Sequence, residues 1–237
     1  MDLPTQLVVG AQMRILGDLG FSLNGTHRVL DFGCGQGRAV NWLRHLGHNV
    51  VGCDIIPAKI PSENLRMMEN GRIPFDDDYF DLVISEQVFE HVKDYDTAIR
   101  EVHRVLKPGG ITMHLFPARY WLAEPHVLVP LGSFFRPRPW LWMWAHFGIR
   151  SEEQAGMTAK EVYRYNVAYL RDHTNYPSTK EVRRYFESHF PHVEFREDLL
   201  IKNNHKRAAH LWPLARRFPA VVWLYRNCRM RVVVCRK

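Results

Sequence analysis

Cysteine is scarce in this sequence, and no targeting segment opens it. Four cysteines occur among 237 residues, and they show neither the close spacing of a zinc site nor a regular disulfide pattern. Residues 1–20 lack the basic start, the continuous apolar stretch and the small-residue cleavage site of a secretory signal. These absences exclude a disulfide-stapled secreted domain and predict a cytoplasmic protein with reduced thiols and no metal site.

Acidic residues are absent from Leu199 to Lys237, a region that contains ten Lys or Arg. The rest of the chain has 22 Lys or Arg against 25 Asp or Glu, a net charge of −3, so this region accounts for the overall charge of +7. Concentrated positive charge attracts anionic partners such as lipid headgroups, phosphorylated molecules or nucleic acid. A basic solvated surface with no partner explains the same composition.

No apolar run is long enough to span a membrane. The most apolar stretch, residues 127–149, is interrupted by three prolines and two arginines, which exclude a spanning helix. Trp140, Trp142 and Trp144 lie near those arginines, a composition typical of a membrane interface. With the basic C-terminal region, this stretch predicts peripheral membrane contact, and the alternative is that its aromatic side chains form a core.

Apolar runs alternate with amphipathic segments and predict an α/β fold. Strands are expected at residues 27–33, 48–56, 64–69, 79–85 and 111–117, and helices at 37–47 and 94–110. Strands that alternate with helices form a parallel sheet with right-handed crossovers. After residue 117 this alternation stops.

Residues 118–177 are rich in Trp, Phe and Pro, and we interpret them as an insertion between the fifth and sixth strands. Helices are expected at 158–173 and 178–190, because Thr158 with Glu161 and Ser178 with Glu181 form capping boxes. Strands are expected at 192–201 and 230–237. The predicted division is a core at 1–117, the insertion at 118–177, and a segment at 178–237 that completes the sheet and includes the basic region.

A glycine-rich turn follows the first strand in VLDFGCGQGRAV, with Gly33, Gly35 and Gly37. Such a turn between a strand and a helix lets a ligand contact the backbone and the helix N-terminus. A dinucleotide-binding turn needs a third glycine where this chain has Arg38, which argues against a nicotinamide dehydrogenase. The carboxylate of Asp31 beside the turn would repel a pyrophosphate.

A second acidic residue, Asp54, ends the next strand, 23 residues after Asp31. An acidic side chain at this place accepts hydrogen bonds from ribose hydroxyls. The pattern therefore predicts a nucleoside ligand that carries positive charge and no pyrophosphate, which indicates S-adenosylmethionine.

Four segments in register resemble the class I S-adenosylmethionine-dependent methyltransferases, and among them the type 11 small-molecule group. They are VLDFGCGQG, VVGCDI, IPFDDDYFDLVISEQVFEHV and REVHRVLKPGGITMHLFP, within residues 29–117. The resemblance implies an enzyme with a Rossmann-like, doubly wound, mostly parallel sheet whose last strand is antiparallel. It also implies cofactor contacts from Asp31, Gly33, Cys34, Gly35, Gly37, Asp54, Ile55, Glu69, Ser85 and Glu86.

Three of these contacts have specific implied roles. Asp54 would bind the ribose hydroxyls, and Ile55 would lie against the adenine. Glu69 would lie near the adenine amino group, although the family pattern has Asp there after a clearer strand.

Methyl transfer to a hydroxyl needs alignment and a base, and histidine suits that role because its pKa lies near neutrality. We expect His126, oriented by Glu124, or else His91, to act as this base, and we expect His114 to be a core residue. The insertion lies where the family varies to bind its acceptor. A small hydroxylated acceptor is therefore expected: a sugar, a glycan, a lipid-linked intermediate or a secondary metabolite.

Other functions compete with this interpretation. An N- or C-methyltransferase for small molecules would use the same scaffold. A nucleic-acid methyltransferase is disfavoured because the chain has no Asn/Asp-Pro-Pro-Tyr-like signature and no appended RNA-binding module. A non-catalytic cofactor-binding partner subunit is disfavoured because Asp31, Gly33, Gly35 and Asp54 are all present.

Overall fold

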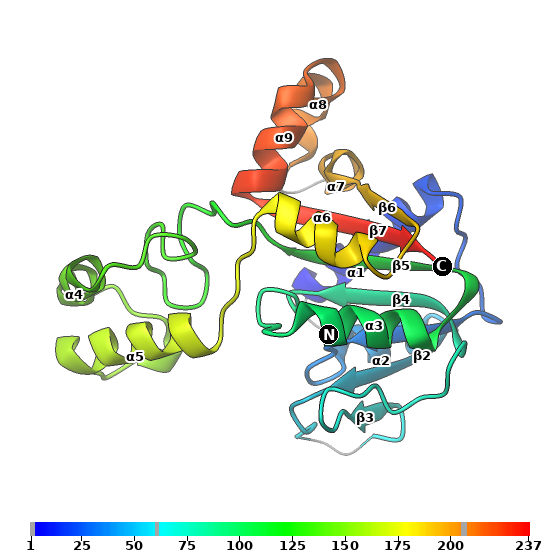
Figure 1. The fold of residues 1–237 in the computed structure, drawn as a ribbon, viewed down its shortest axis with the longest axis horizontal. Helices are drawn as coiled ribbons and strands as arrows, with labels where there is room; N and C mark the ends of the chain where they lie inside the picture. The colour runs from blue at the N-terminus through cyan, green and yellow to red at the C-terminus, as the bar shows by residue number, and fades with distance from the viewer. Residues whose placement is uncertain (1–2, 60–61, 205–207) are drawn as a thin grey trace.

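The computed structural model describes residues 3–59, 62–204 and 208–237. Within these ranges, seven strands form one sheet in the order β3-β2-β1-β4-β5-β7-β6 (Figure 1). The strands are β1 (Arg28–Phe32), β2 (Asn49–Asp54), β3 (Leu65–Met67), β4 (Phe80–Glu86), β5 (Leu106–Pro117), β6 (His192–Phe195) and β7 (Met230–Arg236). β7 runs antiparallel to β5 and β6, and the other pairs are parallel. The predicted α/β fold is confirmed.

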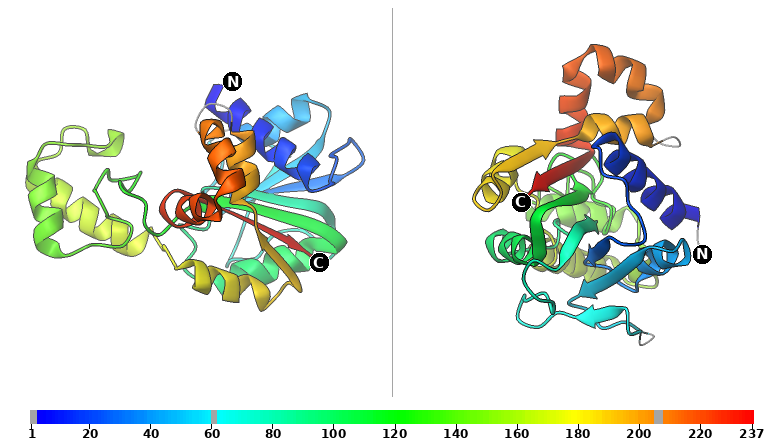
Figure 2. Two further views of the ribbon diagram at one scale, coloured as in Figure 1. Left: turned by 90° about the horizontal axis from the view of Figure 1, so that it is seen from above. Right: turned by 90° about the vertical axis from the view of Figure 1, so that its right-hand side faces the viewer.

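Helices cover both faces of the sheet (Figures 1 and 2). They are α1 (Leu3–Asp18), α2 (Arg38–His45), α3 (Tyr95–Val105), α6 (Thr179–Glu187) and α7 (Glu197–Asn203). Neighbouring strand residues point to opposite faces, so Leu30 and Val83 belong to the core shared with α3 and α6. Val29 and Leu82 belong to the core shared with α1, α2 and α7. Burial on both faces explains the nearly continuous apolar strands.

The fifth strand is longer than the sequence predicts. It begins at Leu106 rather than at Ile111, although Pro108, Gly109 and Gly110 follow directly. The C-terminal residue explains the extension: the Gly109 N–H donates to the Lys237 carbonyl at 2.9 Å, and the Lys237 N–H donates to the Gly110 carbonyl at 3.2 Å. Pairing with Lys237, directly after β7, therefore keeps Gly109 and Gly110 in the strand, although their sequence is typical of a turn.

The strand predicted at 192–201 is wrong over its second half. β6 ends at Phe195, and α7 begins at Glu197. The carboxylate of Glu197 is fully buried and accepts hydrogen bonds from Arg226 Nε at 2.7 Å and from the Val232 N–H at 3.1 Å. These hydrogen bonds from residues 29 and 35 positions away hold the first turn of α7. The sequence also did not indicate α1, nor α8 (Trp212–Arg217) and α9 (Pro219–Cys228) in the basic region.

Residues 118–177 leave the sheet and form a separate lobe around α4 (Arg138–His146) and α5 (Ala159–Asp172) (Figures 1 and 2). The lobe has its own buried cluster, made of Val127, Val129, Leu141 and Leu170. Both predicted capping boxes, at the starts of α5 and α6, are confirmed. The three-part division of the chain stays a prediction.

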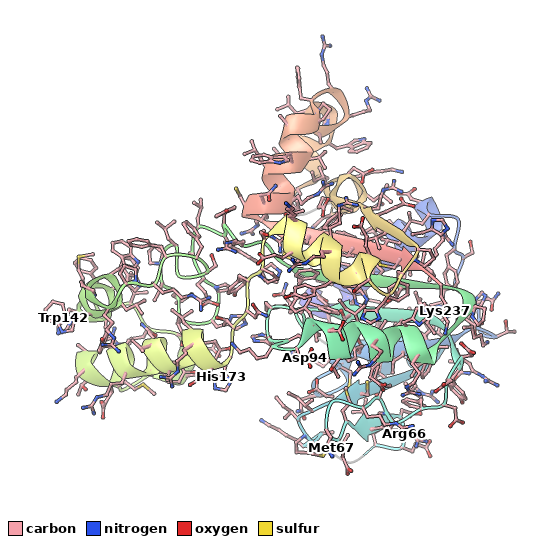
Figure 3. The ribbon with its side chains drawn as sticks, in the orientation of Figure 1. Arg66, Met67, Asp94, Trp142, His173 and Lys237 are labelled. Carbon is pink, nitrogen blue, oxygen red and sulfur yellow. The ribbon has the colours of Figure 1, made fainter. Side chains whose placement is uncertain are left out.

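The sequence left two interpretations of the lobe's tryptophans, a core and a membrane-facing surface, and different tryptophans fit each one. Trp140 and Trp144 pack against the lobe core, and their indole N–H groups donate to the carbonyls of Pro130 at 2.9 Å and Leu128 at 3.0 Å. Trp142 is 55% exposed and lies at the outer end of the lobe (Figure 3). Trp140 and Trp144 thus pack on a core within the insertion rather than on the sheet, and the face of α4 that carries Trp142 remains open to solvent.

Candidate functional site

The glycine-rich turn lies at the carboxyl edge of the parallel strands, where sheets of this kind bind ligands. Gly33, Gly35 and Gly37 all have positive φ, at 75°, 53° and 74°. A Cβ on Gly33 would lie 2.4 Å from Val88, and one on Gly37 would lie 2.7 Å from Leu65. A Cβ on Gly35 would meet no heavy atom of the described residues within 4 Å. Internal packing therefore accounts for two of the glycines, and only Gly35 faces open space.

A cavity of about 230 Å³ lies beside Gly35. Its lining residues are Cys34, Gly35, Asp54, Ile56, Pro57, Ala58, Ser62, Leu65, Arg66 and Met67. The carboxylate of Asp54 connects two other lining residues: Oδ2 accepts from the Gly35 N–H at 2.7 Å, and Oδ1 accepts from the Ile56 N–H at 2.9 Å. Of the residues predicted for the cofactor, Cys34, Gly35 and Asp54 line this cavity.

Asp31 lies behind the turn as a buried carboxyl group, 7% exposed. Burial, together with the negative charges of Glu86 and Asp54, raises the pKa of Asp31 to about 7. A cation at this position would stabilise the ionised form, because an opposite charge lowers the pKa of a carboxyl group. This property matches the predicted positively charged ligand.

Seven of the ten predicted residues lie outside the cavity lining, and Ile55 and Glu69 are two of them. Ile55 is 68% exposed, and its neighbour Ile56 takes the lining position. Glu69 pairs with Arg72 in an isolated bridge, and Met67, two residues before Glu69, lines the cavity.

Ser85 belongs to a buried hydrogen-bond chain rather than to the cavity lining. The Thr112 hydroxyl donates to the Val83 carbonyl at 3.0 Å, so it accepts from His114 Nε2 at 2.8 Å. His114 Nδ1 then accepts from the Ser85 hydroxyl at 2.8 Å. Burial lowers the pKa of His114 to about 3, so this imidazole is a neutral core residue, as predicted.

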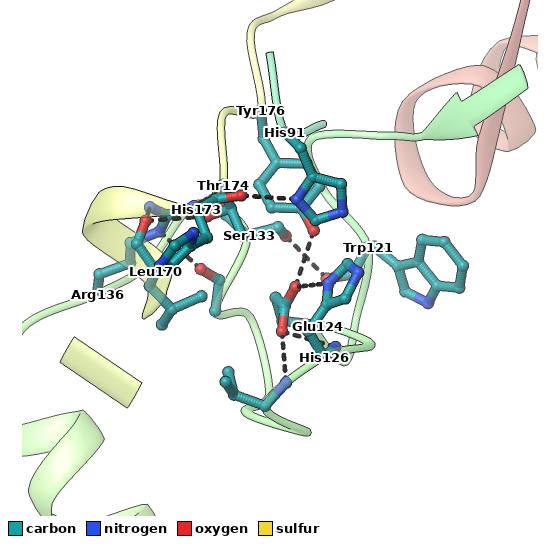
Figure 4. Close-up of polar contacts among 12 residues, drawn as sticks. His91, Trp121, Glu124, His126, Ser133, Arg136, Leu170, His173, Thr174 and Tyr176 are labelled. Carbon is teal, nitrogen blue, oxygen red and sulfur yellow. Dashed lines mark hydrogen bonds and ion pairs between the residues drawn. The ribbon is translucent and has the colours of Figure 1, made fainter. Parts of the chain in front are cut away.

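A second polar cluster lies where the lobe meets the sheet domain (Figure 4). The buried carboxylate of Glu124 accepts four hydrogen bonds. Oε1 accepts from His126 Nδ1 at 2.7 Å and from the Tyr176 hydroxyl at 2.9 Å. Oε2 accepts from the N–H groups of His126 at 2.9 Å and Val127 at 2.8 Å. Burial favours the neutral acid, but these hydrogen bonds outweigh it and lower the pKa of Glu124.

This arrangement sets the tautomer of His126. An ionised carboxylate only accepts, so Nδ1 of His126 carries the proton and Nε2 keeps a free lone pair. His91 is the same tautomer: its Nδ1 carries the proton, because it donates to the His173 carbonyl at 2.6 Å. The two imidazole centroids are 4.8 Å apart. The structure therefore brings both predicted base candidates and the predicted helper Glu124 together.

Residues 30–113 match the methyltransferase domain family. An uncharacterized methyltransferase of Synechocystis sp. is 30% identical over 149 residues, which cover 58% of this chain and 70% of that protein. The chain belongs to the S-adenosylmethionine-dependent methyltransferase family. The predicted resemblance is thus confirmed.

Other methyltransferases share part of the chain or its fold. A ubiquinone biosynthesis O-methyltransferase of Chelativorans sp. is 33% identical over 95 residues, 35% of this chain, and the chain spans only 38% of that protein. A solved S-adenosylmethionine dependent methyltransferase from Mesorhizobium loti aligns with a TM-score of 0.55 at 17% identity, over 98% of this chain and 100% of that one. That likeness shows the fold. Across the described part of this methyltransferase, no helix has both the length and the apolar character to cross a bilayer.

The lobe of this methyltransferase contains a larger cavity next to His126, of about 460 Å³. It is lined by Pro125, His126, Leu128, Arg150, Ser151, Glu152, Glu153, Tyr165 and Tyr169. Aromatic walls and a charged rim suit a small ligand with both apolar and polar groups.

The loop after β4 supplies one residue that sequence reasoning missed. Glu90 is 1% exposed, and neither oxygen of its carboxylate has a hydrogen-bond partner among the described residues. Burial, with the charges of Glu86 and Glu124, raises the pKa of Glu90 to about 8. The available signal was an acidic residue directly before His91 in an otherwise apolar segment.

Proposed function

We propose that this protein transfers a methyl group from S-adenosylmethionine to a hydroxyl group of a small acceptor. The observation that carries the proposal is the pairing of an open glycine position, Gly35, with the Asp54 carboxylate at one cavity. Membership of the methyltransferase family supports the same reaction class.

On the donor side, the residues present fit the cofactor. The absence of a side chain at Gly35 leaves room for a ligand against the backbone, and the Asp54 carboxylate at the same cavity would accept from ribose hydroxyls. Asp31 has a buried carboxyl group that the cationic part of the ligand would hold in its ionised form. When bound, S-adenosylmethionine supplies a methyl group activated by its sulfonium.

On the acceptor side, His126 supports transfer to oxygen. A hydroxyl must lose its proton as it attacks the methyl group, and a positioned imidazole can accept that proton. Nε2 of His126 is free to do so, because Glu124 holds Nδ1. The adjacent cavity in the lobe is our candidate for the acceptor, which we infer to be a sugar, a glycan, a lipid-linked intermediate or a secondary metabolite.

The loop after β4 connects the two sides. Val88 packs against Gly33 in the turn, and the charge of Glu86 acts on both Asp31 and Glu90. The glycine-rich turn thus contacts the loop that carries His91, which supports one shared reaction site.

Calorimetry with S-adenosylmethionine tests the donor half of the proposal. We expect saturable binding to one site per chain, and an absence of binding would contradict the assignment. A screen for methyl transfer to hydroxylated sugars and lipid extracts tests the acceptor half. Methyl groups found only on nitrogen or carbon of the products would favour the N- or C-methyltransferase alternative.

We also infer contact with an anionic membrane surface, through α8 and α9, which project from the body of the protein (Figures 1 and 2). The exposed apolar residues of this helical pair are Leu214, Phe218, Trp223 and Leu224. Arg216 and Arg217 end α8 beside them, which combines apolar contact with positive charge. The prediction from the sequence is a cytoplasmic location with peripheral membrane contact through the aromatic insertion and the basic C-terminal region.

Vesicle sedimentation tests this contact. We expect more binding to vesicles with anionic phospholipid than to neutral ones, and a marked loss when Arg216 and Arg217 are both replaced by Ala. Replacement of Arg171 and Arg164, which lie on α5, is the control. Equal binding to both kinds of vesicle would contradict the inference.

A further inference from the structure

Glu90, His91 and His126 form a cluster with the composition of a metal site. One ligand atom from each side chain lies within 4.8 Å of the other two. Two imidazoles and one carboxylate are a common donor set for divalent transition metals such as Zn²⁺ and Fe²⁺. Composition alone does not make a site, so the orientation of each donor matters.

Both imidazoles have an Nε2 without a hydrogen-bond partner in the part of the chain that the structure describes. His91 Nδ1 donates to the His173 carbonyl, and His126 Nδ1 donates to the Glu124 carboxylate (Figure 4). Histidines that bind metals almost always donate their other ring N–H to a carbonyl or carboxylate in this way. The outer partners of a metal site are therefore already in place.

The third donor has no other partner. The buried carboxylate of Glu90 lacks a hydrogen bond from any described residue, although an unpaired buried carboxylate is costly. A bound metal ion would provide the missing partner for the carboxylate oxygens and so offset the cost of their burial. With Glu90 ionised and both imidazoles neutral, the three ligands carry a single negative charge, so a bound divalent cation would give the site a net charge of +1.

The backbone that carries the ligands is held in place. The Glu90 carbonyl accepts from the Asn175 N–H at 2.6 Å, and Lys93 Nζ donates to the carbonyls of Arg171 at 2.9 Å and Thr174 at 2.8 Å. These bonds join the loop after β4 to the end of the lobe. Ligand atoms around tetrahedral zinc lie roughly 3.4 Å apart, so the side chains need to close by at most about 1.4 Å.

We propose that Glu90, His91 and His126 bind a divalent transition metal, with Zn²⁺ as the best match. Three protein ligands leave coordination positions open for an oxygen of the acceptor, as in catalytic zinc sites. The site would thus select acceptors with a hydroxyl or carboxylate oxygen. It would also replace our expectation, drawn from the cysteine pattern, that the protein has no metal site.

The metal and the base hypothesis use the same atom. If Nε2 of His126 holds a metal, it cannot also accept a proton, and the metal would instead lower the pKa of a bound hydroxyl. Loss of methyl transfer in a His126 variant fits both roles, so metal binding itself must be measured.

The experiment is a Zn²⁺ titration of the full, untagged chain by calorimetry after removal of metals with chelator. We expect one Zn²⁺ per chain, and no comparable binding of Mg²⁺, which prefers oxygen ligands. His91→Ala and His126→Ala should each weaken Zn²⁺ binding by about 100-fold or more. Glu124→Gln, which changes only the outer partner, should weaken it by about 10-fold.

Two controls make the outcome decisive. His146→Ala changes an exposed imidazole elsewhere in the lobe and should leave the affinity unchanged. Glu90→Gln keeps the shape of the side chain, so it should fold normally and still lose affinity; circular dichroism checks the fold. X-ray absorption at the zinc edge should show two imidazoles.

Absence of saturable Zn²⁺ binding would overturn the proposal, and so would equal affinity in the wild type and in both histidine variants. The metal titration needs no S-adenosylmethionine. A protein that binds zinc but not the methyl donor would therefore refute the proposed function alone.

Discussion

A Cβ placed on Gly33 would lie 2.4 Å from Cγ2 of Val88, closer than carbon atoms approach. Gly33 belongs to the turn before α2, and Val88 belongs to the loop after β4 that leads to Glu90 and His91. The lack of a side chain at Gly33 thus lets the glycine-rich turn pack directly against the loop after β4.

We predict that Gly33→Ala destabilises the protein by about 2–4 kcal/mol, because a strained positive φ adds to the clash with Val88. Gly148→Ala is a matched control: its φ is 79°, but a Cβ there would meet no heavy atom of the described residues within 4 Å. Urea unfolding measures the difference between the two variants. If both lose the same stability, the Val88 contact is unimportant. The double variant with Val88→Ala should recover part of the loss.

Asp54→Ala should raise the dissociation constant of S-adenosylmethionine by about 10- to 100-fold, because hydrogen bonds to a charged group are lost. The variant also removes the carboxylate that accepts hydrogen bonds from the N–H groups of Gly35 and Ile56. Calorimetry measures the affinity, with Asp76→Ala, an exposed carboxylate, as the control. An affinity within twofold of the wild type would remove Asp54 from the cofactor site.

Asp31 should make stability depend on pH. Its pKa of about 7 in the folded protein lies above the ordinary value of 3.8, so the folded state binds the proton more tightly than the unfolded state. The stabilisation is complete below about pH 4 and is lost as pH rises to about 7, by up to about 4 kcal/mol. Asp31→Asn should flatten this part of the pH profile in urea unfolding. An unchanged slope would show that Asp31 does not titrate there.

The same group should couple cofactor binding to pH. A cationic ligand favours the carboxylate and lowers the pKa of Asp31, so binding near pH 6.5 should release protons and tighten as pH rises. Calorimetry in two buffers with different ionisation enthalpies detects the release. Asp31→Asn should abolish it, whereas proton release that persists in this variant would assign the effect to another group, such as Glu86.

His126→Ala should reduce the rate of methyl transfer by about 10²- to 10⁴-fold, while the affinity for S-adenosylmethionine stays within about twofold, because His126 does not line the donor cavity. His146→Ala is the control. Full activity in the His126 variant would exclude this imidazole as the base, whereas its role as a metal ligand is tested by the Zn²⁺ titration.

The glycine-rich turn and its two carboxylates could be predicted to lie together because their sequence signals are local. Asp31, Gly35 and Asp54 lie in or directly after the ends of strands whose apolar pattern is plain, and the carboxyl ends of parallel strands share one edge of the sheet. Even here, the reasons for Gly33 and Gly37 could not be predicted, since Val88 and Leu65 are distant in the chain. Whether Ile55 or Ile56 lines the cavity depends on the path of the loop after β2, and a loop has no repeating pattern of apolar residues from which that path could be predicted.

The sequence by itself determined the order of the strands along the chain, the glycine turn and its two carboxylates, because the repeat of apolar residues and the conformational freedom of glycine act within a few residues. Only the tertiary structure decided that Glu90 and His91, from the loop after β4, meet His126 and Glu124, from the lobe. Which histidine nitrogen is free depends on hydrogen bonds to residues such as His173, 82 positions away in the chain. Such a partner is chosen by packing, and no local pattern encodes it.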